Sequence, residues 1–116
     1  MLNLNHKNLK VWKMSLDFVR SIYELTGNFP KNEMFGITNQ LRRASVSVIS
    51  NIAEGASRKS PVERKRFFEI SRSSLVEIDT QLEIAMTLRL APFDKIKELD
   101  RSMNEIFAMT TSLINH

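Results

Sequence analysis

The sequence contains no cysteine, only three glycines and three prolines, and no long apolar run. Without cysteine the chain can form neither a disulfide framework nor a thiolate metal site, and it has no cysteine nucleophile. This absence favours a reducing compartment. No apolar stretch approaches the roughly 20 residues that span a bilayer, and residues 1–10 lack the apolar core of a signal peptide. We therefore expect a cytoplasmic protein with no membrane partner.

Histidine is equally scarce, because only His6 and His116 are present and both lie at the ends. Their positions exclude the Glu-x-x-His motif of di-iron bundles, the His-Glu-x-x-His zinc helix and a Ser–His pair on a rigid element. An enzyme would need a metal or a substrate pocket at Glu54 or Glu77. We expect no enzyme activity, no catalytic residue, no metal and no cofactor. The candidates for a carboxylate site without histidine, which we interpret instead as solvated charges, are Glu77, Asp79 and Glu83.

What the sequence does contain is a helical pattern over its whole length. A chain of 116 residues is long enough for one domain with its own core. Apolar residues recur at spacings of three and four, and Ser60-Pro61-Val62-Glu63 fits a capping box with proline at the first helical position. The pattern predicts an all-α, antiparallel up-and-down four-helix bundle in a single domain, 1–116. The expected helices span about 6–27, 32–56, 61–89 and 93–114.

The first helix has more apolar surface than a bundle member requires. Two apolar seams run side by side along it, where a helix buried on one side usually shows a single stripe. The surplus predicts burial against another subunit. Alternatively, Trp12 and Phe18 cap the core of their own subunit. The predicted oligomer interface consists of Val11, Trp12, Phe18 and Ile22.

The second helix carries a polar seam beside its apolar one. Short hydrogen-bonding groups predominate in it, and Glu54 precedes Arg58 by four residues, the favourable order for a helical ion pair. The seam has two interpretations. It is either an internal hydrogen-bond network, which fixes helix register or lines the axis of an oligomer, or a contact for RNA or protein. Its members are Gln40, Arg43, Ser47, Asn51 and Glu54.

Basic charge is concentrated in the first part of the chain. Residues 1–72 hold 13 Lys and Arg against 6 Asp and Glu, whereas residues 73–116 hold 4 against 7. Cations around the start of the third helix oppose its dipole, an arrangement that an anion such as phosphate would stabilise. The alternative is a solvated positive loop. The predicted nucleic-acid-binding residues are Arg42, Arg58, Lys59, Arg64, Lys65 and Arg66.

Several motifs of this sequence resemble one known family. They are Val11-Trp12, Ile22-Tyr23, Phe29-Pro30, Glu33, the run Gln40-Leu41-Arg42-Arg43-Ala44, the run Asn51-Ile52-Ala53-Glu54-Gly55, Arg58, Ser60, Ser74-Leu75 and Glu77. Together they resemble the four-helix-bundle family named for proteins encoded within intervening sequences of bacterial 23S rRNA genes. The motifs cover about residues 9–85. Ile49 stands where the family usually has proline, and Ser73 where it usually has glycine, which leaves a kink in the second helix and a close helix contact in question.

The resemblance implies a four-helix bundle that assembles into a ring-like homopentamer without established catalytic activity. Accessory proteins of diversity-generating retroelements are similar in fold and bind nucleic acid and a reverse transcriptase through a basic surface. The implied partners are therefore further copies of the chain, RNA or DNA, and a protein such as a reverse transcriptase. We expect a homo-oligomer that binds RNA with weak sequence preference, since exposed aromatics are few. The alternative is a protein-interaction ring with no nucleic-acid ligand.

Overall fold

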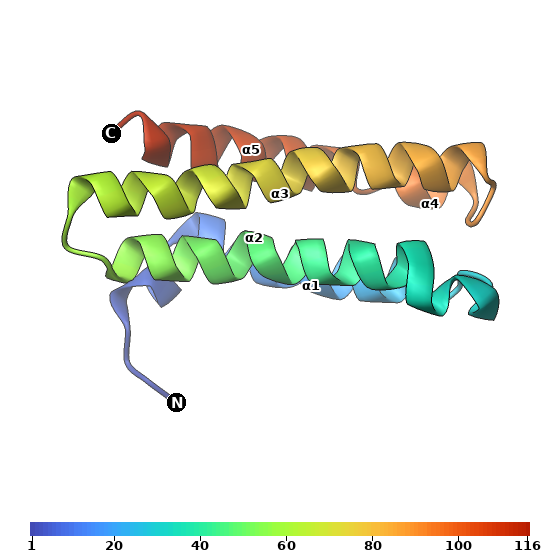
Figure 1. Ribbon diagram of the computed structural model, residues 1–116, viewed down its shortest axis with the longest axis horizontal. Helices are drawn as coiled ribbons and strands as arrows, with labels where there is room; N and C mark the ends of the chain where they lie inside the picture. Colours follow the sequence, from blue (N-terminus) through green and yellow to red (C-terminus); the bar gives the residue numbers. More distant parts are fainter.

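The protein is an all-α antiparallel four-helix bundle, described here from a computed structural model that covers residues 1–116 (Figure 1). Its α-helices are α1 (Lys10–Thr26), α2 (Asn39–Ser57), α3 (Pro61–Thr87), α4 (Phe93–Lys97) and α5 (Asp100–Ile114). Shorter turns of helix are η1 (Asn5–Asn8), η2 (Lys31–Glu33) and η3 (Met34–Thr38). Each long helix packs against two others, so that α1, α2, α3 and α5 follow one another around the bundle. None of the helices combines the length and the apolar character that crossing a membrane would require.

The first two helices begin later than the sequence pattern predicts. The first α-helix starts at Lys10 and is preceded by the 3₁₀ turn η1. The second starts at Asn39, because the backbone of Gly36 has φ −109° and ψ −119°, which breaks the helical ladder after η2. From Asn39 to Ser57 the helix is uninterrupted, and Ile49, which retains the N–H that proline lacks, introduces no kink.

The third helix ends two residues before its predicted limit, at Thr87. Arg89 has φ 54°, the left-handed conformation that usually terminates a helix at glycine. The N–H of Leu90 then donates to the carbonyl of Ala85 at 3.0 Å, which closes the helix end.

The fourth predicted helix is divided into α4 and α5. The division falls at Leu99, whose N–H donates to the carbonyl of Ile96 three residues back at 3.1 Å. This is the tighter 3₁₀ spacing, and it separates the two helices. Both Ile96 and Leu99 are buried, so the turn keeps its apolar side chains in the core.

One continuous apolar core of 18 residues joins the helices of the bundle. Its closest helix contact lies between α2 and α3. A Cβ atom on Gly55 would lie 2.6 Å from the ring of Phe68, so only glycine allows the approach. Nearby, the hydroxyl of Ser71 donates to the carbonyl of Val48 at 2.7 Å. Ser73, by contrast, is exposed, and its side chain does not widen this contact.

Candidate nucleic-acid interface

The turn between α2 and α3 is built by a strong helix start. Ser60 is the N-cap of α3, and its hydroxyl accepts a hydrogen bond from the N–H of Glu63 at 3.4 Å. Pro61 occupies the first helical position, as the sequence predicts. The reciprocal bond of a capping box, in which the N–H of Ser60 would donate to the carboxylate of Glu63, is not formed. The cap fixes the start of α3 between two groups of basic residues, one before it and one after it.

Arg64 turns inward and closes the end of α2. One of its terminal nitrogens donates to the carbonyl of Ala56 at 2.9 Å and to that of Arg58 at 3.1 Å. Its guanidinium also lies 5.8 Å from the ring centre of Phe68. A cation at a helix C-terminus stabilises the helix dipole and satisfies carbonyls that lack partners. Arg64 is therefore a structural residue of the turn, and one of its two terminal nitrogens is occupied by these carbonyls.

Arg58 is partly engaged on the surface. Its guanidinium pairs with Glu54 at 3.2 Å, the ion pair that the spacing of four predicts. It also lies over the ring of Phe67, 5.0 Å from its centre. Both charged groups remain about half exposed, and a pair of this kind contributes at most about 1 kcal/mol. A phosphate could therefore compete with Glu54 for Arg58.

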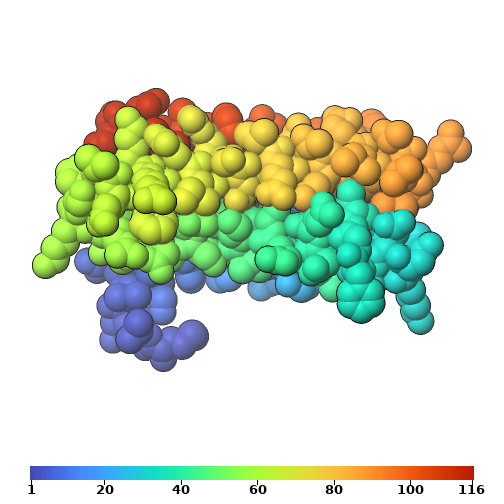
Figure 2. All heavy atoms as spheres, in the orientation of Figure 1, coloured from blue at the N-terminus to red at the C-terminus, as the bar shows by residue number.

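Three of the predicted cations are free. Lys59, Lys65 and Arg66 are exposed, and none of them makes an ion pair or a side-chain hydrogen bond. They lie at the turn and on the first turns of α3, at the end of the bundle where the chain passes from α2 to α3 (Figure 2). Charged groups without local partners are the ones that can neutralise an external anion.

Arg42 does not belong to this group. It lies near the start of α2, 16 residues before Arg58, which directly follows the helix, and so about 24 Å away along the axis. Its Nε donates to the hydroxyl of Thr26 at 2.9 Å, and its guanidinium stacks 4.6 Å from the ring centre of Tyr23. Arg42 thus fastens α2 to α1 at the opposite end of the bundle. Arg42 and the other predicted cations are close in the sequence, but most of the length of α2 separates them in space.

The fold adds cations that the sequence pattern alone did not group with the turn. Because α1 and α2 are antiparallel, the start of α1 lies at the same end of the bundle as the turn after α2 (Figure 1). Lys10 and Lys13 are exposed there and have no ion pair. The antiparallel bundle predicted from the sequence already implies that Lys10 and Lys13 lie at this end. We call the set Lys10, Lys13, Lys59, Lys65 and Arg66 the basic end.

The polar seam of α2 is only partly an internal network. The hydroxyls of Ser47 and Ser74 are 2.9 Å apart and join α2 to α3. Asn51 donates to the carbonyl of Ser47 at 2.8 Å and to its hydroxyl at 3.1 Å. The remaining members, Gln40, Arg43 and Glu54, are exposed. The internal-network interpretation therefore does not extend to Arg43, which has no hydrogen-bonding or ionic partner within the subunit.

The predicted oligomer interface requires a correction. Val11, Phe18 and Ile22 are at most 4% exposed and belong to the core of their own subunit. Only Trp12 of the predicted four stays partly exposed at the edge of the core, with its ring 5.8 Å from that of His6. A side chain already buried within the subunit has no surface left for a second copy.

A different apolar surface lies along the junction of α1 and α2. Leu16, Tyr23 and Val46 are between 41% and 49% exposed. They recur at spacings of three and four with half-buried neighbours, and Arg42 links the two helices at one end. We call this surface the apolar strip, which consists of Leu16, Val19 and Tyr23 on α1 and Val46, Ile49 and Ala53 on α2.

The carboxylates that the sequence singled out do not converge. Glu77 is exposed and accepts a hydrogen bond from Gln81 at 3.2 Å. Asp79 and Glu83 are exposed on α3, and Glu54 is occupied by Arg58. No three histidine, aspartate or glutamate side chains are placed to hold a metal ion together.

Comparisons with known proteins agree with this architecture. One solved structure is a protein of unknown function from the S23 ribosomal protein family of Bacteroides thetaiotaomicron, with a TM-score of 0.84 at 20% sequence identity. The similarity covers 91% of this chain and 96% of that one, and at this identity it shows the fold alone. A search of curated proteins found no match. The family model described as "23S rRNA-intervening sequence protein" matches residues 7–112, nearly the whole bundle. The chain therefore belongs to the family of 23S rRNA-intervening sequence proteins.

Proposed function

We propose that the protein is a non-catalytic homo-oligomer that binds nucleic acid, preferentially RNA, through its basic end. The observation that carries the proposal is the set of five exposed cations without acidic partners at one end of the bundle. Phosphate neutralisation with release of counterions is the general source of affinity for such a surface. The membership of the family is consistent with this function but does not by itself specify a ligand.

The surface favours backbone contacts over base recognition. Phe67 is half-buried beneath Arg58, and Phe68 is buried beneath Arg64, so neither ring is presented for stacking on a base. Apart from Trp12, which is partly buried beside His6, this end offers no stacking platform, so recognition rests mainly on phosphates and shape. We therefore expect similar affinities for RNAs of different sequence. If the chain assembles, each copy repeats the basic end, and multivalent contact raises the overall affinity.

A protein-interaction scaffold is the second candidate, and a separate observation favours it. The apolar strip presents three large apolar side chains, each more than two-fifths exposed, on adjacent helices. Contiguous apolar surface of this kind marks protein contacts more often than nucleic-acid contacts. In this alternative the basic end provides solubility alone.

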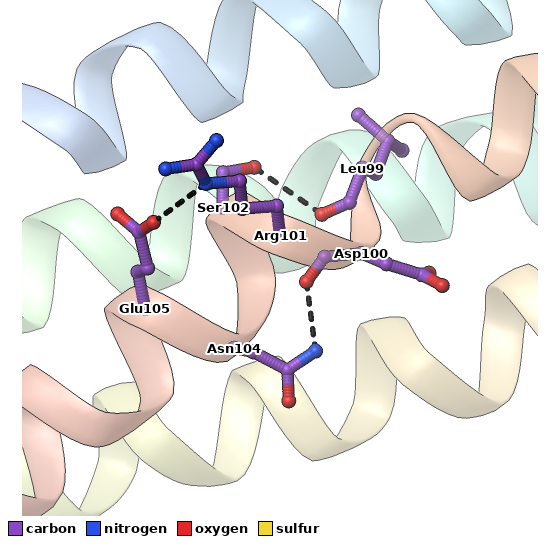
Figure 3. A network of polar contacts seen from close by, with 6 residues as sticks. All are labelled: Leu99, Asp100, Arg101, Ser102, Asn104 and Glu105. Atoms are coloured by element: carbon purple, nitrogen blue, oxygen red, sulfur yellow. Dashed lines mark hydrogen bonds and ion pairs between the residues drawn. The ribbon is translucent and has the colours of Figure 1, made fainter.

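The two candidates separate in one binding experiment with matched variants. The test variant replaces Lys59, Lys65 and Arg66 with Gln, and the control replaces Lys95, Lys97 and Arg101 with Gln. Both remove three positive charges, but the control cations are already paired with Glu98, Asp100 and Glu105, respectively. Figure 3 shows the last of these pairs on the first turns of α5.

We expect the test variant to bind a labelled RNA more weakly and with a flatter dependence on salt. The logarithmic salt slope should fall by about 0.7 to 0.9 for each phosphate that the variant no longer neutralises. Fluorescence anisotropy at several salt concentrations measures this, with unlabelled RNA and DNA as competitors. If RNA affinity falls equally in the test and control variants, net charge alone accounts for the binding. No RNA binding by the unmodified protein at physiological salt would reject the proposal in favour of the scaffold.

A further inference from the structure

A groove between α3 and α5 has an apolar floor and acidic edges. Its cavity of ≈ 270 Å³ lies over Leu75 and Met103, with Val76 and Phe107 exposed at its lips. Small-molecule sites usually have volumes of about 300 to 1,000 Å³, so this cavity fits an apolar side chain better than a metabolite. The carboxylates of Asp79 and Asp100 complete the lining at the end nearer α4.

Negative charge at this groove is only partly balanced. Lys97 pairs with Asp100 at 2.6 Å, and its pKa is raised above the ordinary value, first by this hydrogen bond and the charge of Asp100 and further by Glu83 and Asp79. Asp79 and Glu83 themselves have neither an ion pair nor a side-chain hydrogen bond. A cation brought to the groove would therefore find an uncompensated carboxylate. At the opposite end of the groove, the guanidinium of Arg72 lies 5.8 Å from the ring centre of Phe107.

The segment before η1 has the complementary character. Residues 1–4, which we call the N-terminal arm, project from the bundle, and both Leu2 and Leu4 are exposed (Figures 1 and 2). Lysine follows at positions 7, 10 and 13, whereas the first acidic residue is Asp17. The arm is thus apolar and the residues after it are basic. Lys7 donates to the carbonyl of Leu2 at 2.6 Å, whereas η1 packs against α1 and α2, so only residues 1–4 stand clear of the bundle.

The arm cannot reach this groove within its own subunit. Four extended residues span at most about 14 Å. The arm leaves the molecule beside α1 and α2, whereas the groove lies between α3 and α5 (Figure 1). Leu75 is also 14 residues into α3 from the turn end, about 21 Å along the axis. An arm in this groove must come from another copy.

We propose that the groove between α3 and α5 is the docking site for the N-terminal arm of a second copy of the chain. Leu2 or Leu4 fills the cavity, and Lys7, the first basic residue after the arm, faces Asp79. The other apolar hollow near the arm lies between α1 and α5, against Leu9 and Leu113. Its lining includes Lys10 and His116 but no Asp or Glu side chain, so it lacks the charge complementarity of the acidic groove. The inference rests on the proposed self-association, to which it adds a specific contact.

The absence of cysteine allows a direct test with full-length chains. One protein carries Asn3→Cys in the arm and a second carries Asn104→Cys in the groove lining. The control partner carries Ser112→Cys beside the other hollow. After mild oxidation of equimolar mixtures, non-reducing electrophoresis measures the disulfide-linked dimer. We expect roughly tenfold more heterodimer with Asn104→Cys than with the control, because docking raises the effective concentration of the thiols.

A second pair of variants tests whether Asp79 attracts the basic residues of the other copy. Adding Asp79→Lys to the groove partner should abolish the excess of heterodimer, whereas Glu69→Lys, an exposed acid elsewhere on α3, should not. Equal cross-linking to both positions, or a cross-link formed only within one chain that carries Asn3→Cys and Asn104→Cys together, would overturn the proposal. Light scattering on the same samples keeps the two proposals separate. An oligomeric mass without the specific cross-link would reject the arm contact and leave self-association standing.

Discussion

At the scale of single residues, Arg64 and Lys65 show that one residue type in one cluster can serve opposite purposes. Arg64 turns towards α2 and donates to two carbonyls at its end, whereas Lys65 points to solvent without a partner. The sequence predicted both as phosphate contacts, because it shows the charge but not the acceptors. Those acceptors, Ala56 and Arg58, belong to the end of another helix and become visible only when the turn is folded.

Replacing Arg64 should therefore affect stability more than RNA binding. We expect Arg64→Ala to lower the free energy of unfolding by about 2 kcal/mol, since it removes two hydrogen bonds from a charged donor. The matched variant Lys65→Ala should change it by less than about 0.5 kcal/mol. Urea denaturation of both variants measures the difference. Equal stability of the two would mean that the contact of Arg64 with the carbonyls contributes nothing.

Gly55 is the residue on which the closest contact between α2 and α3 depends. Gly55→Ala places a methyl group 2.6 Å from the ring of Phe68 and 3.1 Å from the carbonyl oxygen of Arg64, so the ring or the helices must shift. We expect the free energy of unfolding to fall by about 1 to 3 kcal/mol, typical of overpacking, although alanine is the better helix former. Ser50→Ala, on the exposed face of the same helix, is the control and should be nearly neutral. A stabilised Gly55→Ala protein would contradict this packing.

At the scale of helices, periodicity and end signals predicted the elements well but not which apolar seam of α1 faces inward. The pattern showed that α1 is apolar over a wide arc, and Val11, Phe18 and Ile22 were assigned to a partner. In the structure these three form the core, whereas Leu16 and Tyr23 on the adjacent seam stay partly exposed. An angular pattern gives the width of an apolar face. Its orientation depends on the neighbouring helices, which the pattern does not include.

The end of α3 carries a residue that sequence rules would not place there. Arg89 adopts φ 54°, a conformation that costs a side-chain-bearing residue about 1 to 2 kcal/mol and glycine very little. We expect Arg89→Gly to raise the free energy of unfolding by about 0.5 to 1 kcal/mol, once the greater freedom of glycine in the unfolded chain is subtracted. Arg89→Ala removes the same charge but keeps Cβ, and it should not stabilise. Thermal denaturation of both variants distinguishes relief of backbone strain from removal of charge.

At the scale of the whole molecule, the antiparallel topology decides what the charged residues can do together. It brings Lys10 and Lys13 to the end where Lys59, Lys65 and Arg66 lie, and it moves Arg42 to the other end. The order of helices was predictable from short connections and clear helix ends. Which cations are free and which are hydrogen-bonded was not predictable, because this depends on contacts between helices such as that of Arg42 with Thr26.

The apolar strip gives the last prediction, which concerns assembly. Light scattering should give a mass several times 13.4 kDa, because exposed side chains on adjacent helices can bury much apolar area against another copy. Leu16→Glu combined with Val46→Glu should lower this mass while the circular dichroism spectrum stays helical. Two charges in a desolvated interface oppose association, whereas they cost little on a free surface.

The matched control is Val62→Glu with Ile84→Glu, which also exchanges two exposed apolar side chains for acids, but on α3. Its mass should equal that of the unmodified protein. A monomer in the unmodified protein at micromolar concentration would reject assembly altogether, and an equal drop in mass in both variants would place the contact elsewhere than the strip. If only the strip variant dissociates, its RNA affinity should fall as well, since the basic ends would no longer act together although all five of their cations remain.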